Sequence, residues 1–290
     1  MTPAKESESK PALPRGRVPR RDGKRQFPNF MLKDAFTLQT ILGLGALFQC
    51  FFVAVLPAPY AFFPTARILL YALVTSAIQT VSSSKNSYMS DVLLGRLTAR
   101  IPKKNSSFVN QPSSDQLVVF LLGVRFNHPL GFLCPGGGEI TKYFFALLDD
   151  LDAHAEEFGL LGQSAWRADE RGSQNTLMYM FYFRSLEDVH AFAHGELHHE
   201  AWQKYYAMVK ETGLKHIGIY HETFCVSPGE YEGLYLNMPK ILMGHINVKV
   251  AKEDVDEKEE WINSLVSANG SLRTQYGRMG KEGGKTFKAA

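Results

Sequence analysis

The sequence predicts an α+β protein: a ferredoxin-like βαββαβ domain preceded by an N-terminal transmembrane helical hairpin. Between residues 117 and 250 the apolar pattern changes in the order strand, helix, strand, strand, helix, strand, which is the order of a ferredoxin-like unit. Before it, two long apolar runs occupy residues 38–81. The expected domains are a basic disordered tail (1–37), one or two transmembrane helices (38–81), a linker (82–116), the ferredoxin-like domain (117–250) and a polar C-terminal tail (251–290).

The first apolar run, Leu38–Leu56, contains nineteen residues and no charge, close to the roughly 20 residues that a helix needs to cross a bilayer. The second run, Phe62–Val81, contains Arg67 near one end, where its head group can reach the membrane interface. The proline-rich segment 57–64 between the runs predicts a turn. A cleavable signal peptide is the alternative, but the first run starts later and is longer than the apolar core of such a peptide.

Basic residues flank both apolar runs. Nine Lys and Arg side chains precede the first run, and Lys85, Arg96, Arg100, Lys103 and Lys104 follow the second. By the positive-inside rule both flanks lie in the cytosol. We therefore expect a membrane protein, in the endoplasmic reticulum, whose soluble domain faces the cytosol.

Composition argues against two classes of protein. The net charge is only +3, and the basic residues gather at the N-terminus rather than on a domain face, so no nucleic-acid partner is expected. Cys50, Cys134 and Cys225 are odd in number and lack CxxC spacing, which does not predict a disulfide framework.

The soluble domain is predicted element by element. The expected elements are a strand at 117–126, a helix at 141–158, strands at 162–169 and 175–183, a helix that begins at Ser185, and a strand at 215–226. The strand at 175–183 is apolar on both faces. Because the two helices cover one face of such a sheet, we expect a second copy to cover the other, which predicts a homodimer.

The helix that begins at Ser185 carries four of the nine histidines. His190, His194 and His198 recur every four residues and so lie on one stripe of a continuous helix. Histidine suits proton transfer near neutral pH, and it also binds metal or haem iron. His194 and His198 are the candidates for a base or an iron ligand, and Gly195 between them is a residue that can break the helix. The alternative is that these histidines are simply solvated.

Aromatic side chains follow the histidines. Trp202, Tyr205 and Tyr206 offer walls for a flat substrate, although aromatic residues at this spacing also form cores. No glutamate follows His190 or His194 as HExxH would require, so no metal site is predicted.

Polar residues at two strand ends are further candidates. Arg125 and Asn127 share one face of the first strand and could hold a developing oxyanion at a pocket mouth. The alternative is a strand-ending turn with Arg125 paired to a carboxylate. Tyr220, a candidate substrate-binding residue, and His221 lie on opposite faces of the last strand, so at most one of them faces a given cavity.

Several segments together resemble a known family. They are Val124–Gly131 (VRFNHPLG), Glu156–Gly162 (EEFGLLG), Met180–Phe183 (MFYF), Phe192–Trp202 (FAHGELHHEAW) and His216–Thr223 (HIGIYHET). As a set they resemble a fungal family of monooxygenase-like proteins related to the antibiotic biosynthesis monooxygenases. The resemblance covers roughly residues 118–244 and implies a dimeric α+β barrel with a pocket between sheet and helices.

The resemblance leaves the chemistry open. Within this broad superfamily some relatives oxidise aromatic polyketides without a cofactor, some bind and degrade haem, and some dehydrate aldoximes on haem. The first expectation is a membrane-anchored monooxygenase-like enzyme that needs no cofactor and oxidises a hydrophobic intermediate of secondary metabolism. The alternatives are a haem-binding enzyme of the same fold and a non-catalytic, membrane-tethered scaffold.

Overall fold

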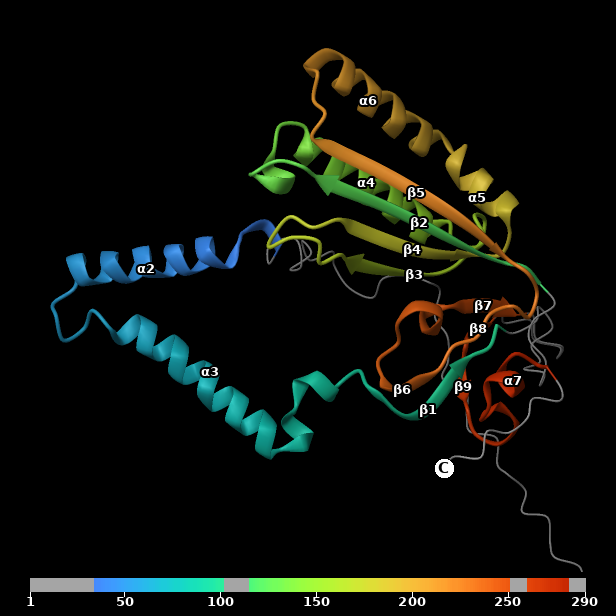
Figure 1. Ribbon diagram of the computed structural model, residues 1–290, viewed down its shortest axis with the longest axis horizontal. Helices are drawn as coiled ribbons and strands as arrows, with labels where there is room; N and C mark the ends of the chain where they lie inside the picture. The colour runs from blue at the N-terminus through green and yellow to red at the C-terminus, as the bar shows by residue number, and fades with distance from the viewer. Residues whose placement is uncertain (1–33, 102–114, 251–259, 282–290) are drawn as a thin grey trace, which may run out of the picture.

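The computed structural model describes residues 34–101, 115–250 and 260–281, and its centre is a four-stranded antiparallel sheet (Figure 1). The sheet consists of β2 (Leu117–Phe126), β3 (Leu160–Arg167), β4 (Leu177–Phe183) and β5 (Ile217–Val226), in the order β3-β4-β2-β5. Three helices, α4 (Gly137–Ala153), α5 (Leu186–Ala193) and α6 (Glu196–Thr212), lie on one face. This is the strand order and layering of a ferredoxin-like unit, so the predicted α+β class is confirmed.

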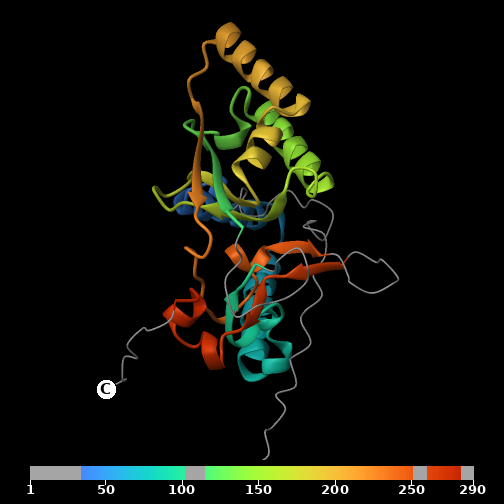
Figure 2. The same cartoon turned by 90° about the vertical axis from the view of Figure 1, so that its right-hand side faces the viewer.

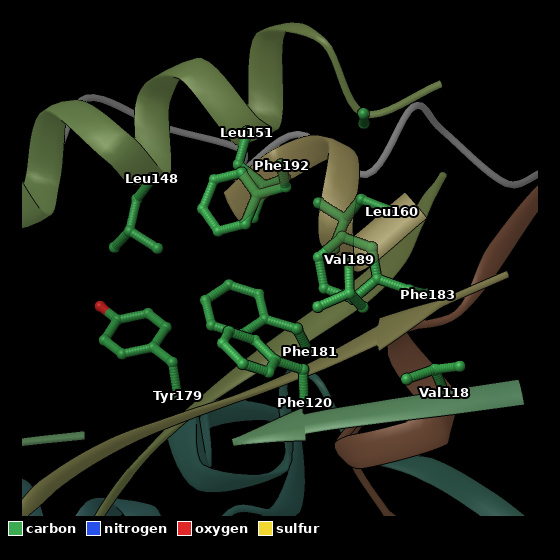
Figure 3. Close-up of a cluster of buried hydrophobic side chains, with 11 residues drawn as sticks. Val118, Phe120, Leu148, Leu151, Leu160, Tyr179, Phe181, Phe183, Val189 and Phe192 are labelled. Atoms are coloured by element: carbon green, nitrogen blue, oxygen red, sulfur yellow. The ribbon is translucent and has the colours of Figure 1, made fainter. Parts of the chain in front are cut away.

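The core forms between this sheet and the helices because each central strand alternates large apolar side chains onto the helix face. Phe120 on β2 lies opposite Phe181 on β4, and their ring centroids are 6.0 Å apart. Figure 3 shows them beneath Leu148 and Leu151 of α4. Burying one such side chain stabilises the fold by roughly 1.5–3 kcal/mol, so this cluster holds the two layers together.

The predicted histidine helix is two helices. Ser185 starts α5 as predicted, and its hydroxyl accepts a hydrogen bond from the backbone N–H of Asp188 at 3.1 Å. The first helix stops at Ala193, and Gly195, whose backbone is extended, starts α6. Gly195 therefore breaks the helix, so the expectation of one continuous histidine stripe is wrong.

Both apolar runs form helices that leave the soluble domain (Figure 1). Helix α2 covers Leu38–Val55, α3 covers Phe63–Val81, and neither has a buried residue. Near the turn, the side-chain amide of Gln49 donates to the carbonyl of Ala61 at 3.2 Å. Of the helices in the described parts of the chain, α2 is long and apolar enough to cross a membrane.

Additional strands lie outside the ferredoxin-like unit. Strand β1 (Leu93–Ala99) pairs on one side with β6 (Tyr235–Met238) and on the other with β9 (Leu265–Ser267), and β7 (Asn247–Val250) pairs with β8 (Glu260–Asn263). The prediction of a linker at 82–116 is wrong for β1, and that of a polar tail at 251–290 is wrong for β8 and β9. All five are short, and the partners of β1 lie far away in the sequence, so local periodicity does not reveal this sheet. The predicted basic tail lies almost entirely outside the described residues.

The C-terminal strands cover part of the sheet face that lies away from the helices (Figure 2). Tyr182 on β4 and Leu117 on β2 are buried there against Tyr231, Ile246 and Val248. Strand β4 is apolar on both faces, and within a single chain these C-terminal strands cover part of the face that the helices leave open. The burial argument for a second copy applies to the uncovered part of this face.

Candidate functional site

A cavity of about 230 Å³ lies between the sheet and the three helices. Strands β2 and β5 form its floor, and α4, α5 and α6 form its walls. Its lining is mostly apolar and aromatic, and its polar members are Tyr143, His190, His198, Tyr205, His221 and Thr223, together with the indole of Trp202. A concave apolar site with a few convergent polar groups is the usual form of a small-molecule site.

His198 is placed in this cavity by the break at Gly195. The ring lies beside the backbone of Ala193, the last residue of α5, which favours its protonated form. Burial lowers the pKa of His198, the bond to Ala193 opposes this, and the charges of nearby histidines, His221 first, lower the pKa further. A pKa below the usual value favours the neutral imidazole, whose unprotonated nitrogen can accept a proton.

The other two predicted histidines, His190 and His194, lie in different places relative to the cavity. His190, near the end of α5, lines the cavity, although its side chain is mostly exposed. His194 is exposed and does not line the cavity. Its Nδ1 lies 2.7 Å from the carbonyl oxygen of His190, so it serves to end the helix.

Two of the predicted aromatic residues line the cavity. The ring of Trp202 lies 6.3 Å from that of His198 and 5.7 Å from that of Tyr205. The hydroxyl of Tyr205 donates to the carbonyl of Ile217 at 3.0 Å, which fixes this wall to β5. Tyr206 is exposed and stacks on the outer side of Trp202.

Arg125, Asn127 and Tyr220 lie on the opposite face of the sheet, in a second hollow of about 570 Å³. The Arg125 guanidinium is 3.5 Å from the carboxylate of Glu170. That carboxylate also accepts hydrogen bonds from the backbone and hydroxyl of Thr176, and these bonds lower the pKa of Glu170. The structure does not bring these three predicted site residues to the histidine cavity, because strand alternation turns them away from Phe120 and Val124.

Sequence reasoning chose Tyr220 over His221 on the last strand, and it missed Thr223 and Tyr143. His221 and Thr223 alternate with Tyr220 along β5 and face the helices, and Tyr143 faces the cavity from α4. The alternation on β5 was a usable signal, because Ile217 and Ile219 mark the same face as the inner one. Tyr143 had no comparable signal, since its exposure depends on how α4 and α6 pack.

The cavity does not fit haem. At about 230 Å³ it is small for a macrocycle of that size. Its lining also lacks the Lys or Arg side chains that would neutralise the propionates of haem. Within the described residues, no three His, Cys, Asp or Glu side chains come together as a metal site.

One relative shows to which family this chain belongs. Monooxygenase af470 from Aspergillus fumigatus is 39% identical over 274 residues, which cover 94% of this chain and 98% of that protein. The chain belongs to the monooxygenase af470-like family. The family model itself matches residues 117–243, which include the whole histidine cavity. The predicted resemblance and the expectation of a monooxygenase are thereby confirmed.

Solved structures with similar folds are distant from this family member. An aldoxime dehydratase in complex with butyraldoxime has a TM-score of 0.37 at 15% identity, over 51% of this chain and 40% of that one. SnoaB, a cofactor-independent oxygenase from Streptomyces nogalater, has a TM-score of 0.25 at 11% identity, over 38% of this chain and 91% of that one. A putative antibiotic biosynthesis monooxygenase from Caulobacter crescentus has a TM-score of 0.26 at 13% identity, over 38% and 90%.

Proposed function

We propose that this chain is a membrane-anchored monooxygenase that oxidises a hydrophobic, electron-rich small molecule without a cofactor, with His198 as the general base. The observation that carries the proposal is the partly buried His198 imidazole in an apolar cavity, where burial lowers its pKa. The substrate class that we expect, an intermediate of secondary metabolism, is part of the proposal. The open cavity speaks against a purely scaffolding role, which would let side chains fill it.

The proposed reaction starts when the free nitrogen of His198 removes a proton from an activated C–H bond of the substrate. The carbanion gives its electrons to O₂, a C–O bond forms, and the imidazolium returns the proton to give a hydroperoxide. Removal of the second proton then forms the C=O bond and breaks the O–O bond, and the departing hydroxide takes that proton. In sum, R₂CH₂ and O₂ give R₂C=O and H₂O, and the substrate supplies all the electrons.

The carbanion needs hydrogen-bond donors that stabilise its negative charge, because the cavity around it is mostly apolar. The lining offers the ring N–H groups of His190 and His221 and the hydroxyls of Tyr143 and Thr223. Tyr143 is half-buried, whereas His190, His221 and Thr223 are exposed at the open side of the cavity. We assign this role to His221 first, because its ring lines the same cavity as His198, from the β5 floor beside Phe120.

The anchor is the second part of the proposal. The outward side chains of α2 are apolar and exposed along the whole helix, which water does not favour and a bilayer would. We propose that α2 crosses the membrane, with α3 as a second crossing and the domain in the cytosol. An apolar substrate dissolved in the bilayer would then meet the cavity at raised concentration. Pairing with a second copy over the uncovered sheet face also remains a proposal.

Labelled oxygen tests the reaction. The purified full-length chain, in detergent, is supplied with ¹⁸O₂ and an aromatic substrate that carries an acidic CH₂ group. One ¹⁸O atom in the product carbonyl and one in water are expected, without added reductant, metal or flavin. Turnover that requires any of these additions would contradict the cofactor-free proposal.

A further inference from the structure

The chain enters the domain through a buried carboxylate just before α2. Asp34 is only 6% exposed. It accepts hydrogen bonds from the backbone N–H of Asn175 at 2.6 Å, from the Asn175 side-chain amide at 2.8 Å and from the guanidinium of Arg167 at 3.2 Å. A buried carboxylate is tolerated only when it is bonded in this way. Asp34 therefore clamps the chain to the loop between β3 and β4.

The clamp fixes where α2 begins. Thr37 caps the helix, and its hydroxyl accepts a hydrogen bond from the N–H of Thr40 at 3.2 Å. Ala35 and Phe36 are the two residues between clamp and cap, so no flexible linker separates α2 from the domain. The end of the domain that faces a membrane is set by this junction.

Gln174 ties a second loop to the same junction. Its backbone N–H donates to the carbonyl of Asp34 at 2.7 Å, and its side-chain amide donates to the carbonyl of Pro129 at 2.6 Å. Gly131 leaves room for this side chain, since a Cβ there would lie 2.8 Å from the Gln174 amide oxygen. The loop between β2 and α4 thus lies beside the first turn of α2 (Figure 1).

This loop exposes apolar side chains that the core does not use. Leu130 is 57% exposed and Leu133 is 62% exposed, and Phe36 is exposed beside the clamp. Exposed Lys215 lies near the same loop, because the neighbouring His216 ring is 2.9 Å from the carbonyl oxygen of Pro135. Apolar residues beside a lysine suit the boundary between lipid tails and anionic head groups.

We propose that the loop between β2 and α4 contacts the lipid interface through Leu130 and Leu133, beside α2. The inference rests on the proposed membrane anchor and adds to it a fixed orientation of the domain. The inward side chains of the same loop, Phe132 and Cys134, pack with Val124 and Ile140, which line the histidine cavity. The lipid-contacting loop is therefore also the outer shell of one end of that cavity.

Tryptophan scanning in vesicles tests this contact. Full-length Leu133→Trp is reconstituted in phosphatidylcholine–phosphatidylserine vesicles, with and without brominated acyl chains, which quench nearby indoles. Leu236→Trp, on β6 and equally exposed, is the matched control. We expect the added emission of Leu133→Trp to be largely lost in brominated vesicles and that of Leu236→Trp to persist. Asp34→Ala should restore much of the emission at position 133 by releasing the clamp.

The possible outcomes distinguish the proposed lipid contact of the loop from the proposed membrane anchor. If the protein sediments with vesicles while position 133 escapes quenching, the loop contact is wrong and the anchor stands. The emission at position 133 could instead change with protein concentration but not with bromine. In that case the loop contacts a second copy of the chain, and the proposal is wrong. If the protein does not sediment with vesicles at all, both the anchor and the loop contact fail.

Discussion

His198 is the residue on which the proposed chemistry depends, and its substitution should affect turnover more than folding. His198→Ala removes the base, and general-base contributions are on the order of 10²–10⁴-fold. We expect a loss of kcat in that range, measured as oxygen uptake. His194→Ala is the control, because this exposed ring bonds to its own helix rather than to the cavity. Equal losses in the two variants would contradict the assignment.

The pH dependence follows from the lowered pKa of His198. The neutral form is the base, so turnover should be constant near pH 7 and fall only as the pH drops through a value below the ordinary 6.5. The same shift contributes stability that is full above pH 6.5 and is lost as the pH falls, because the unfolded chain then binds more protons. His221→Gln removes a repulsive charge and should move the acid limb of the kcat profile to higher pH.

The sequence predicts the kinds of residue at the site better than their positions. His190, His198, Trp202 and Tyr205 were predicted and line the cavity. Arg125 was predicted for the same site but lies on the other face of the sheet. The strand alternation that turns it away is visible in the sequence, and so is Gly195 as a possible helix break, but the sequence does not show which of His194 and His198 the break turns into the cavity.

At the scale of single elements, the turn before β3 depends on Gly159. Its φ is +62°, and a Cβ there would lie 2.3 Å from the Asp188 carboxyl group, which is bonded to Ser185 and Arg184. We expect Gly159→Ala to lower the free energy of unfolding by about 1–3 kcal/mol, measured by chemical denaturation. Gly138→Ala, in the first turn of α4 with open space around it, is the control and should not destabilise the fold. If Gly159→Ala leaves the free energy of unfolding unchanged, the turn relaxes around the added Cβ and the prediction is wrong.

Long elements were predictable and short ones were not. Strand β2 occupies the predicted residues 117–126, because its apolar run is long and bounded by polar segments. Helix α4 starts at Gly137 rather than 141, since Gly136 adopts a left-handed conformation that reverses the chain directly before it. Strands β1 and β9 are held by partners distant in the sequence, and neither has a local pattern that predicts it.

For the molecule as a whole, the proposed anchor predicts that one charge in α2 weakens membrane association. An arginine at the centre of a crossing helix costs roughly 2.5–3.5 kcal/mol. We expect Leu47→Arg to shift the protein from the carbonate-resistant membrane pellet toward the soluble fraction. Leu94→Arg makes the same change at an exposed leucine of β1 and should leave the distribution unchanged. If both variants stay in the pellet, α2 is not the anchor.

Strand β1, the middle strand of the sheet β6-β1-β9, is made long before the two strands that pair with it. Translation produces β1 early, but its partners β6 and β9 leave the ribosome only after the whole four-stranded sheet has been made. Until then the nascent β1 has unpaired backbone groups, and such open edges promote aggregation. A messenger truncated before the codon for Leu265 would release a chain in which one edge of β1 stays open. Pairing with β9 thus protects an edge of β1 that stays open until residues 265–267 have been made.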